Sequence, residues 1–68
     1  MGDERERYIK IGAKIKFYRQ LKKIGQTELA GKVGITSQYL SKIECGKQMP
    51  SLQVLLLIAE KLEIDAAV

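Results

Sequence analysis

The chain has 68 residues, of which 46% are hydrophobic and 29% charged, with a formal net charge of +4 and a sequence pI near 9.4. We expect residues 1–68 to form one small domain, and a chain of this size buries only ~60% of its unfolded surface, so little material remains for a deep catalytic cleft. The hydrophobic content argues against intrinsic disorder, and the longest apolar run, 54–59, is far shorter than the ~20 residues of a membrane span.

The chain contains one cysteine, Cys45, and no histidine. One cysteine cannot form an internal disulfide, and a zinc site cannot be assembled around it. The N-terminal residues are polar and do not resemble a secretion signal. We therefore expect a cytoplasmic protein without a metal, a cofactor, a small-molecule ligand or a membrane partner.

A first helix is predicted to run to about residue 23, because apolar side chains recur there every three to four residues. These are Tyr8, Ile11, Ile15, Tyr18 and Leu21 or Lys22. Gly25 then provides the N-cap of a second, short helix that begins at Gln26. That helix ends before Gly34, whose freedom at positive φ suits a sharp helix exit.

Thr36 or Ser37 is the predicted N-cap of a third helix that ends near Gly46, and Ser51 is the predicted N-cap of a fourth helix. The fourth helix continues to about residue 62, with Leu52, Leu55, Leu56, Ala59 and Leu62 at helical spacing. Residues 64–68 form a short closing segment. No credible strand is visible, so we predict an all-α, compact domain of four to five helices.

Positive charge is concentrated in the middle of the chain. Residues 10–47 hold nine Lys or Arg and two acids, which gives +7, whereas residues 1–9 sum to −1 and residues 48–68 to −2. This distribution favours a nucleic acid or another polyanion as partner. The alternative is a solvated lysine-rich helix face.

Residues 26–45 carry the most informative pattern, two short helices around one turn. Ala30 is small enough for a second helix to cross closely, and Gly34 supplies the turn. The apolar residues that lock the two helices together are Leu29, Val33, Ile35, Leu40 and Ile43. The outer face of the later helix stays polar, as is needed to place a helix in the DNA major groove.

From Ile11 to about Ala66 the chain resembles the phage repressor and Cro-like helix-turn-helix proteins, often called the Xre type. The matching residues are Ile11, Gly12, Ile15, Arg19, Gln26, Leu29, Ala30, Val33, Gly34, Ile35, Leu40, Ile43, Glu44, Gly46, Lys47, Pro50, Ser51, Leu52, Ala59 and Leu62. The resemblance implies a lambda-repressor-like fold and a repressor-like transcription regulator. Its helix at about 37–44 would enter the major groove of double-stranded DNA.

The resemblance also implies roles for individual residues. Bases would be read by the residues at Ser37, Gln38, Ser41 and Lys42, and phosphates would be bound by Gln26 and by backbone amides near Lys47. Gln can bond adenine bidentately and Lys can donate to guanine, while the amides of a helix N-terminus attract phosphate. Tyr39 is expected to contact a phosphate or a thymine methyl group. Alternatively Tyr39 is a half-buried packing residue, Ser37 is only an N-cap, and Gln38 is a solvated residue.

Arg19 and Glu44 match positions that form a structural ion pair in the family, so we predict that they join the first helix to the end of the third. Three positions depart from the family pattern. Lys23 replaces a common Gly, and Gly31 lies inside a helix at a cost of ~1 kcal/mol relative to Ala. Cys45 occupies a place often held by a possible phosphate-binding residue, and without a second cysteine nearby we do not expect a redox switch.

Val54, Leu57 and Ile58 are apolar where the family tolerates polar residues, and we predict that they form an exposed patch. The resemblance implies that this end mediates homodimerisation, which would place two recognition helices one DNA turn, ~34 Å, apart on a palindromic operator. Alternatively, further C-terminal residues cover the patch.

The sequence also bears on two other function classes. An enzyme is not expected, because the chain offers no nucleophile beside a base and no phosphate-binding loop around Gly31 or Gly46. The alternative is an antitoxin or adaptor of the same fold that acts mainly through protein contacts.

Overall fold

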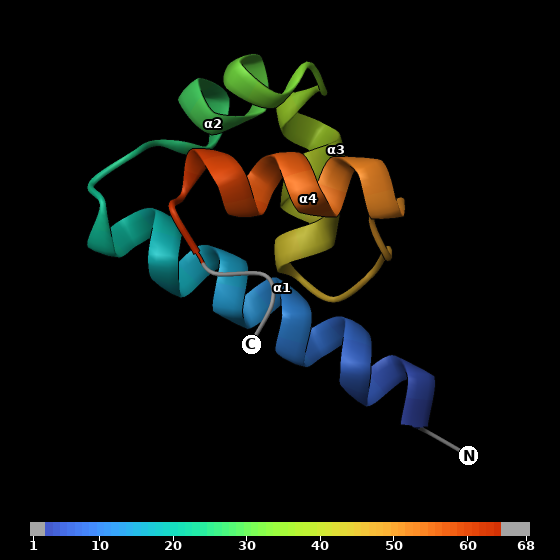
Figure 1. The fold of residues 1–68 in the computed structure, drawn as a ribbon. Helices are drawn as coiled ribbons and strands as arrows, with labels where there is room; N and C mark the ends of the chain where they lie inside the picture. Colours follow the sequence, from blue (N-terminus) through green and yellow to red (C-terminus); the bar gives the residue numbers. More distant parts are fainter. Residues whose placement is uncertain (1–2, 65–68) are drawn as a thin grey trace.

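The computed structural model describes residues 3–64, which contain four helices and no strand. The helices are α1 (Asp3–Leu21), α2 (Gln26–Val33), α3 (Ser37–Glu44) and α4 (Leu52–Lys61). In Figure 1, α1 runs diagonally below the other helices and α4 crosses in front of α3. The predicted all-α class is confirmed. Residues 65–68 of the expected fifth segment lie outside the described part of the chain.

Side-chain caps fix the starts of α3 and α4. The Thr36 hydroxyl accepts a hydrogen bond from the backbone N–H of Tyr39 at 3.0 Å, and the Ser51 hydroxyl accepts one from Val54 at 3.2 Å. Both bonds satisfy an N–H group that has no partner inside the helix. Thr36 is therefore the N-cap of α3, and Ser37 is the first residue of that helix.

Left-handed residues end the helices. Gly34, at φ 87°, closes α2, and the N–H groups of Gly34 and Ile35 both donate to the carbonyl of Ala30. This pairing satisfies a carbonyl that would otherwise lack a partner at the helix end. Gly46 takes φ 76° after α3 and plays the same part there.

The ends of α1 and α4 use the same geometry without glycine. Lys23 and Glu63 both have φ 59°, a region that side chains with a Cβ rarely occupy. The N–H of Ile24 donates to the carbonyl of Arg19, as a left-handed helix exit requires. Helix α1 consequently ends at Leu21, two residues earlier than predicted.

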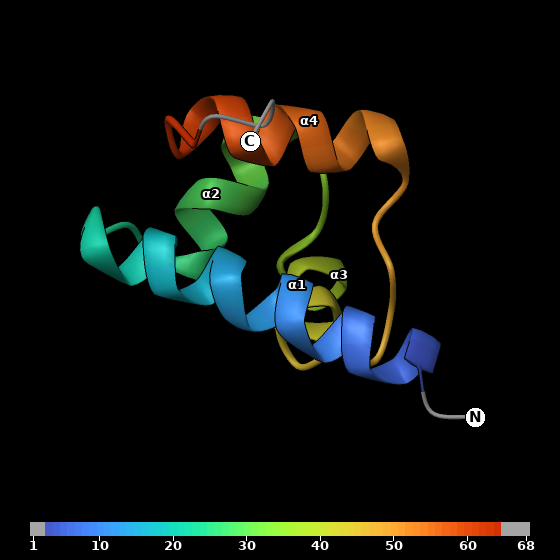
Figure 2. The same ribbon diagram turned by 60° about the horizontal axis from the view of Figure 1, so that its bottom comes forward.

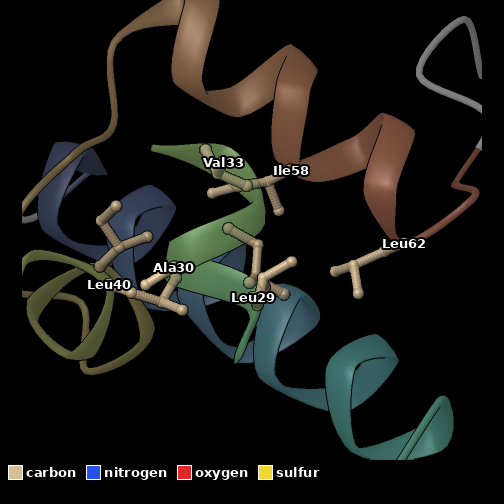
Figure 3. Close-up of a cluster of buried hydrophobic side chains, with 8 residues drawn as sticks. Leu29, Ala30, Val33, Leu40, Ile58 and Leu62 are labelled. Carbon is tan, nitrogen blue, oxygen red and sulfur yellow. The ribbon is translucent and has the colours of Figure 1, made fainter. Parts of the chain in front are cut away.

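The core lies around α2, which packs against both α3 and α4. Figure 3 shows Leu29, Ala30 and Val33 of α2 pointing toward Leu40 of α3 and toward Ile58 and Leu62 of α4. Ile15 of α1 and Ile43 of α3 complete the buried cluster. Ala30 is buried where the helices cross, as its small size predicts.

Gly12 sets the distance between α1 and α3. A Cβ atom on Gly12 would lie 2.1 Å from the carbonyl oxygen of Ile43 and 2.8 Å from that of Glu44. Both neighbours are backbone atoms of α3, so they cannot move aside as a side chain could. The close crossing of these two helices therefore requires glycine at this position.

The prediction for the buried face of α4 was right for Leu62 and wrong for Leu52, Leu56 and Ile58. Leu52 and Leu56, expected to face inward, are 71% and 50% exposed, whereas Ile58, expected on an exposed patch, is fully buried. Helix α4 is apolar nearly all round, so periodicity cannot select its inner side, and packing against α2 turns Ile58 and Leu62 inward. Leu21, placed on the inner stripe of α1, is likewise exposed.

None of the helices in the described range 3–64 combines the length and apolar character needed to cross a membrane.

Candidate nucleic-acid interface

The predicted base-reading residues share the outer side of α3. Gln38 and Lys42 are exposed, one helical turn apart, and Ser37 and Ser41 are half-buried beside them. On the opposite side of the same helix, Leu40 and Ile43 are fully buried and hold α3 against the core. Helix α3 therefore presents amide, ammonium and hydroxyl groups from a rigid support.

Tyr39 lies at the edge of this surface. Its side chain is half-buried and packs against the core cluster. The packing role considered for Tyr39 is thus present in the structure. The phosphate contact remains a prediction, because a tyrosine can bury its ring and still present its hydroxyl to a ligand.

Gln26 is the first residue of α2, and α3 holds its side chain in place. The Gln26 amide nitrogen donates to a Glu44 carboxylate oxygen at 3.0 Å. A primary amide carries two N–H groups and one carbonyl, so Gln26 retains one donor and one acceptor beyond this bond. The N-terminus of α2 has no side-chain cap within the described residues, which leaves its first backbone amides available to an anion.

In the loop after α3, a side chain is more available to a phosphate than the backbone amides are. The N–H groups of Cys45, Gly46 and Lys47 donate to carbonyls of α3, at 3.0, 3.1 and 2.9 Å. These three amides close the helix end, so the exposed ammonium of Lys47 is the group there that could reach a phosphate. Cys45 is the C-cap of α3 and its side chain is exposed.

A buried ion pair joins α1 to the end of α3. The Arg19 guanidinium donates to both carboxylate oxygens of Glu44, at 2.7 and 2.9 Å, and to the carbonyl of Ile24 at 2.8 Å. The two paired side chains are only 9% and 2% exposed. Hydrogen bonding to Glu44 raises the pKa of Arg19 above its ordinary value, so the guanidinium stays charged.

The predicted Arg19–Glu44 pair is thus present, and it extends to a residue that the sequence did not connect with it. Glu44 accepts from Gln26 as well as from Arg19, so one carboxylate fixes α1, α2 and α3 together. Gln26 and Glu44 are 18 positions apart and belong to different helices. Spacing alone gives no signal for such a contact.

A second ion pair connects the two strained helix ends. The ammonium of Lys22 binds the carboxylate of Glu63. Lys22, which is partly exposed, lowers the pKa of the fully solvated Glu63. Its hydrogen bond has the larger effect and its charge the smaller one. The sequence did not predict this pair either, because the two residues are 41 positions apart.

Comparison with known proteins identifies the family. The Helix-turn-helix family model matches residues 15–68, which include α2, α3, α4 and the last seven residues of α1. The chain belongs to the Cro/C1-type helix-turn-helix family. This family is a DNA-binding type of transcription regulator, as the resemblance predicted.

Two similar proteins support this assignment. The chain is 43% identical over 56 residues to the ImmF control region 10 kDa protein of Bacillus phage phi105, a match that covers 82% of this chain and 62% of the phage protein. It is also 43% identical over 47 residues to an uncharacterized HTH-type transcriptional regulator of Methanocaldococcus jannaschii, covering 69% of this chain and 71% of that protein.

A solved structure agrees with the fold. The restriction-modification controller protein C.AhdI from Aeromonas hydrophila superimposes with a TM-score of 0.86 at 28% sequence identity. The superposition covers 93% of this chain and 91% of the controller protein. The helix arrangement described above is therefore also found in this controller protein.

Proposed function

We propose that this chain is a sequence-specific double-stranded DNA-binding transcription regulator that places α3 in the major groove of a palindromic operator as a homodimer. Family membership supports the coarse function, and the polar outer face of α3 supports the mode of binding. A helix with a buried apolar side and an exposed polar side fits the width of the major groove. We expect residues 1–68 to act as one DNA-binding domain of a repressor-like protein in the cytoplasm, without catalytic activity.

In this proposal Gln38 and Lys42 read base edges because they are the most exposed polar residues of the outer α3 face. Ser37 and Ser41 are half-buried and have short side chains, so they would contact only those bases or phosphates that lie close to the helix. Gln26 and Lys47 would hold the flanking phosphates and so fix the register of α3 on the duplex. The fixed Gln26 amide suits that task because its position is already determined before DNA binds.

Selection of bound sites from random duplex DNA tests the proposal. The wild type should enrich one palindromic sequence, and Gln38→Ala or Lys42→Ala should relax the preference at defined base pairs. A bidentate base contact contributes ~1–3 kcal/mol of discrimination, which corresponds to roughly 5- to 150-fold. The matched controls Gln53→Ala and Lys61→Ala alter exposed residues of α4 and should leave the selected sequence unchanged. Failure to enrich any sequence would contradict the proposal.

The adaptor alternative has some support from the exposed apolar residues of α4. Leu52 and Leu56 lie in solvent in this structure and could meet another protein. Salt dependence separates the two functions. DNA affinity falls steeply as salt rises because bound counterions are released, whereas an apolar protein interface is little affected.

We propose that the homodimer forms through the exposed side of α4 rather than through the patch predicted from the sequence. Ile58 belongs to the core and is not available to a partner, and Val54 and Leu57 are half-buried. Leu52 and Leu56 are one turn apart on the outward side of the helix. Two copies related by a two-fold axis could bury these leucines against each other.

Sedimentation velocity with Leu56→Asp tests this interface. Leu56 is half-exposed, so the substitution should leave the fold intact while placing a charge in the interface. We expect a monomer for Leu56→Asp and an unchanged dimer for Gln53→Asp, which alters an exposed polar residue of the same helix. A dimer that survives Leu56→Asp would contradict the assignment.

A further inference from the structure

The outer side of α1 carries an apolar ridge that the DNA-binding surface does not use. Ile9, Phe17 and Leu21 are between 50% and 64% exposed, and the exposed Ala13 lies between the first two. These four residues recur every four positions, so they form a continuous, slightly spiralling ridge about 18 Å long on the helix. An apolar array of this kind commonly marks an interaction surface.

The ridge points away from the rest of the protein at Ala13, Phe17 and Leu21, whereas its first residue, Ile9, lies against Gly46 in the loop after α3. Gly12, Ile15 and Arg19 form the side of α1 that packs on α3 and the core. At 100° per residue, Phe17 is rotated by about 200° from Ile15. Figure 2 shows α1 along the edge of the molecule opposite α4, with α2 between these two helices and α3 behind α1.

Positive charge lines this ridge. Lys16 lies on one side of the ridge, and Lys10 and Lys14 lie on the other side. All three side chains are exposed, and none of them takes part in an ion pair with another described residue. No acidic residue occurs from residue 7 to residue 27. The surface is therefore apolar along its axis and cationic along its borders.

We propose that the outer side of α1 is a docking surface for an acidic amphipathic helix of another protein. The apolar side of such a helix would cover Phe17 and its neighbours, and its flanking carboxylates would meet Lys10, Lys14 and Lys16. This is the helix-on-helix form of recognition, in which apolar residues at i, i+3, i+4 and i+7 supply affinity and flanking charges supply specificity. The surface is separate from the outer face of α3, so it acts whether or not DNA is bound.

Charge decides against a second copy of this chain as the occupant. A two-fold pairing of α1 with itself would bring the same three lysines of each copy close together, and like charges across an interface oppose association. An acidic partner converts the same lysines into favourable contacts. The charge pattern therefore selects a partner of different composition.

Fluorescence anisotropy with two synthetic helical peptides tests this proposal. The first peptide has Leu at i, i+3, i+4 and i+7 with Glu at the flanking positions, and the second has Lys in place of each Glu. We expect the acidic peptide to bind the 68-residue chain at least tenfold more tightly than the basic peptide. The double variant Phe17→Ser and Leu21→Ser should weaken acidic-peptide binding at least tenfold, whereas Met49→Ser, which alters an exposed apolar residue before α4, should not change it. Circular dichroism checks that each variant is folded.

Mapping of amide chemical shifts in the wild type gives a second readout that needs no variant. Shift changes caused by the acidic peptide should cluster on the exposed residues from 9 to 21. Equal binding of both peptides, shift changes centred on α3 or α4, or binding to phosphatidylglycerol vesicles without binding to the acidic peptide would each overturn the proposal. Retention of DNA binding by the Phe17 and Leu21 variant keeps this test distinct from the test of the proposed function.

Discussion

Removal of Glu44 should destabilise the fold more than any other single change in the polar residues of the interface. In Glu44→Ala, the Arg19 guanidinium keeps its charge and its bond to the carbonyl of Ile24 but loses both bonds to the carboxylate. Gln26 loses its partner at the same time. The result is a buried cation without a counter-charge at the junction of three helices.

The size of the effect follows from the burial of the pair. Breaking a buried ion pair on one side costs about 3–5 kcal/mol, because the remaining charge stays desolvated without compensation. A chain of 68 residues has a total stability of about 3–10 kcal/mol at 0.05–0.15 kcal/mol per residue. Glu44→Ala should therefore lose a large part of its folded population.

Urea unfolding followed by far-UV circular dichroism measures this loss, and a double variant separates charge from packing. Replacing both Arg19 and Glu44 by Met removes the pair without leaving an unpaired charge, so it should be more stable than Glu44→Ala. DNA binding by Glu44→Ala should fall mainly through its unfolded fraction, with a smaller loss because Gln26 is no longer held in place. The scaffold role of the pair would be refuted if the free energy of unfolding of Glu44→Ala were within about 1 kcal/mol of the wild-type value. Complete loss of DNA binding with unchanged stability would refute it as well.

Further predictions concern backbone positions and pH. Gly12→Ala should destabilise by at least ~1–3 kcal/mol in urea unfolding because its Cβ meets backbone atoms, whereas Gly31→Ala, which meets nothing within 4 Å, should stabilise by up to ~1 kcal/mol. Lys23→Gly should gain ~0.5–1 kcal/mol by relieving a left-handed residue, and Lys23→Ala should gain nothing. Because Lys22 holds the Glu63 pKa below its ordinary value of 4.5, the contribution of that pair is complete above pH 4.5 and is lost as pH falls below it. Glu63→Gln should reduce the fall in melting temperature below pH 4.5. An unchanged fall would contradict the assignment.

Local signals were sufficient to predict most of the helix boundaries. Thr36 and Ser51 cap helices through bonds to residues three positions away, and Gly34 ends α2 through its own backbone conformation. Such interactions are contained within a few neighbouring residues, so the sequence displays them directly. The end of α1 was predicted two residues too late because a lysine, and not a glycine, adopts the left-handed conformation there.

Features that depend on contacts between distant residues could not be predicted from the sequence. Leu56 and Ile58 are both apolar members of the same helix, and only packing on α2 determines that Ile58 is buried. The bond between Gln26 and Glu44 depends on how α2 and α3 cross. The exposed ridge of α1 did have a sequence signal, because Phe17 and Leu21 belong to a series with four-residue spacing.

Methylation interference on the selected operator tests the central claim most directly. A methyl group on guanine N7 projects into the major groove, and one on adenine N3 projects into the minor groove. If α3 enters the major groove of a palindromic site as part of a homodimer, guanine methylation should block binding at two clusters about one helical turn, ~10 base pairs, apart. Interference from adenine N3 alone, or no interference at any base, would contradict this mode of DNA recognition.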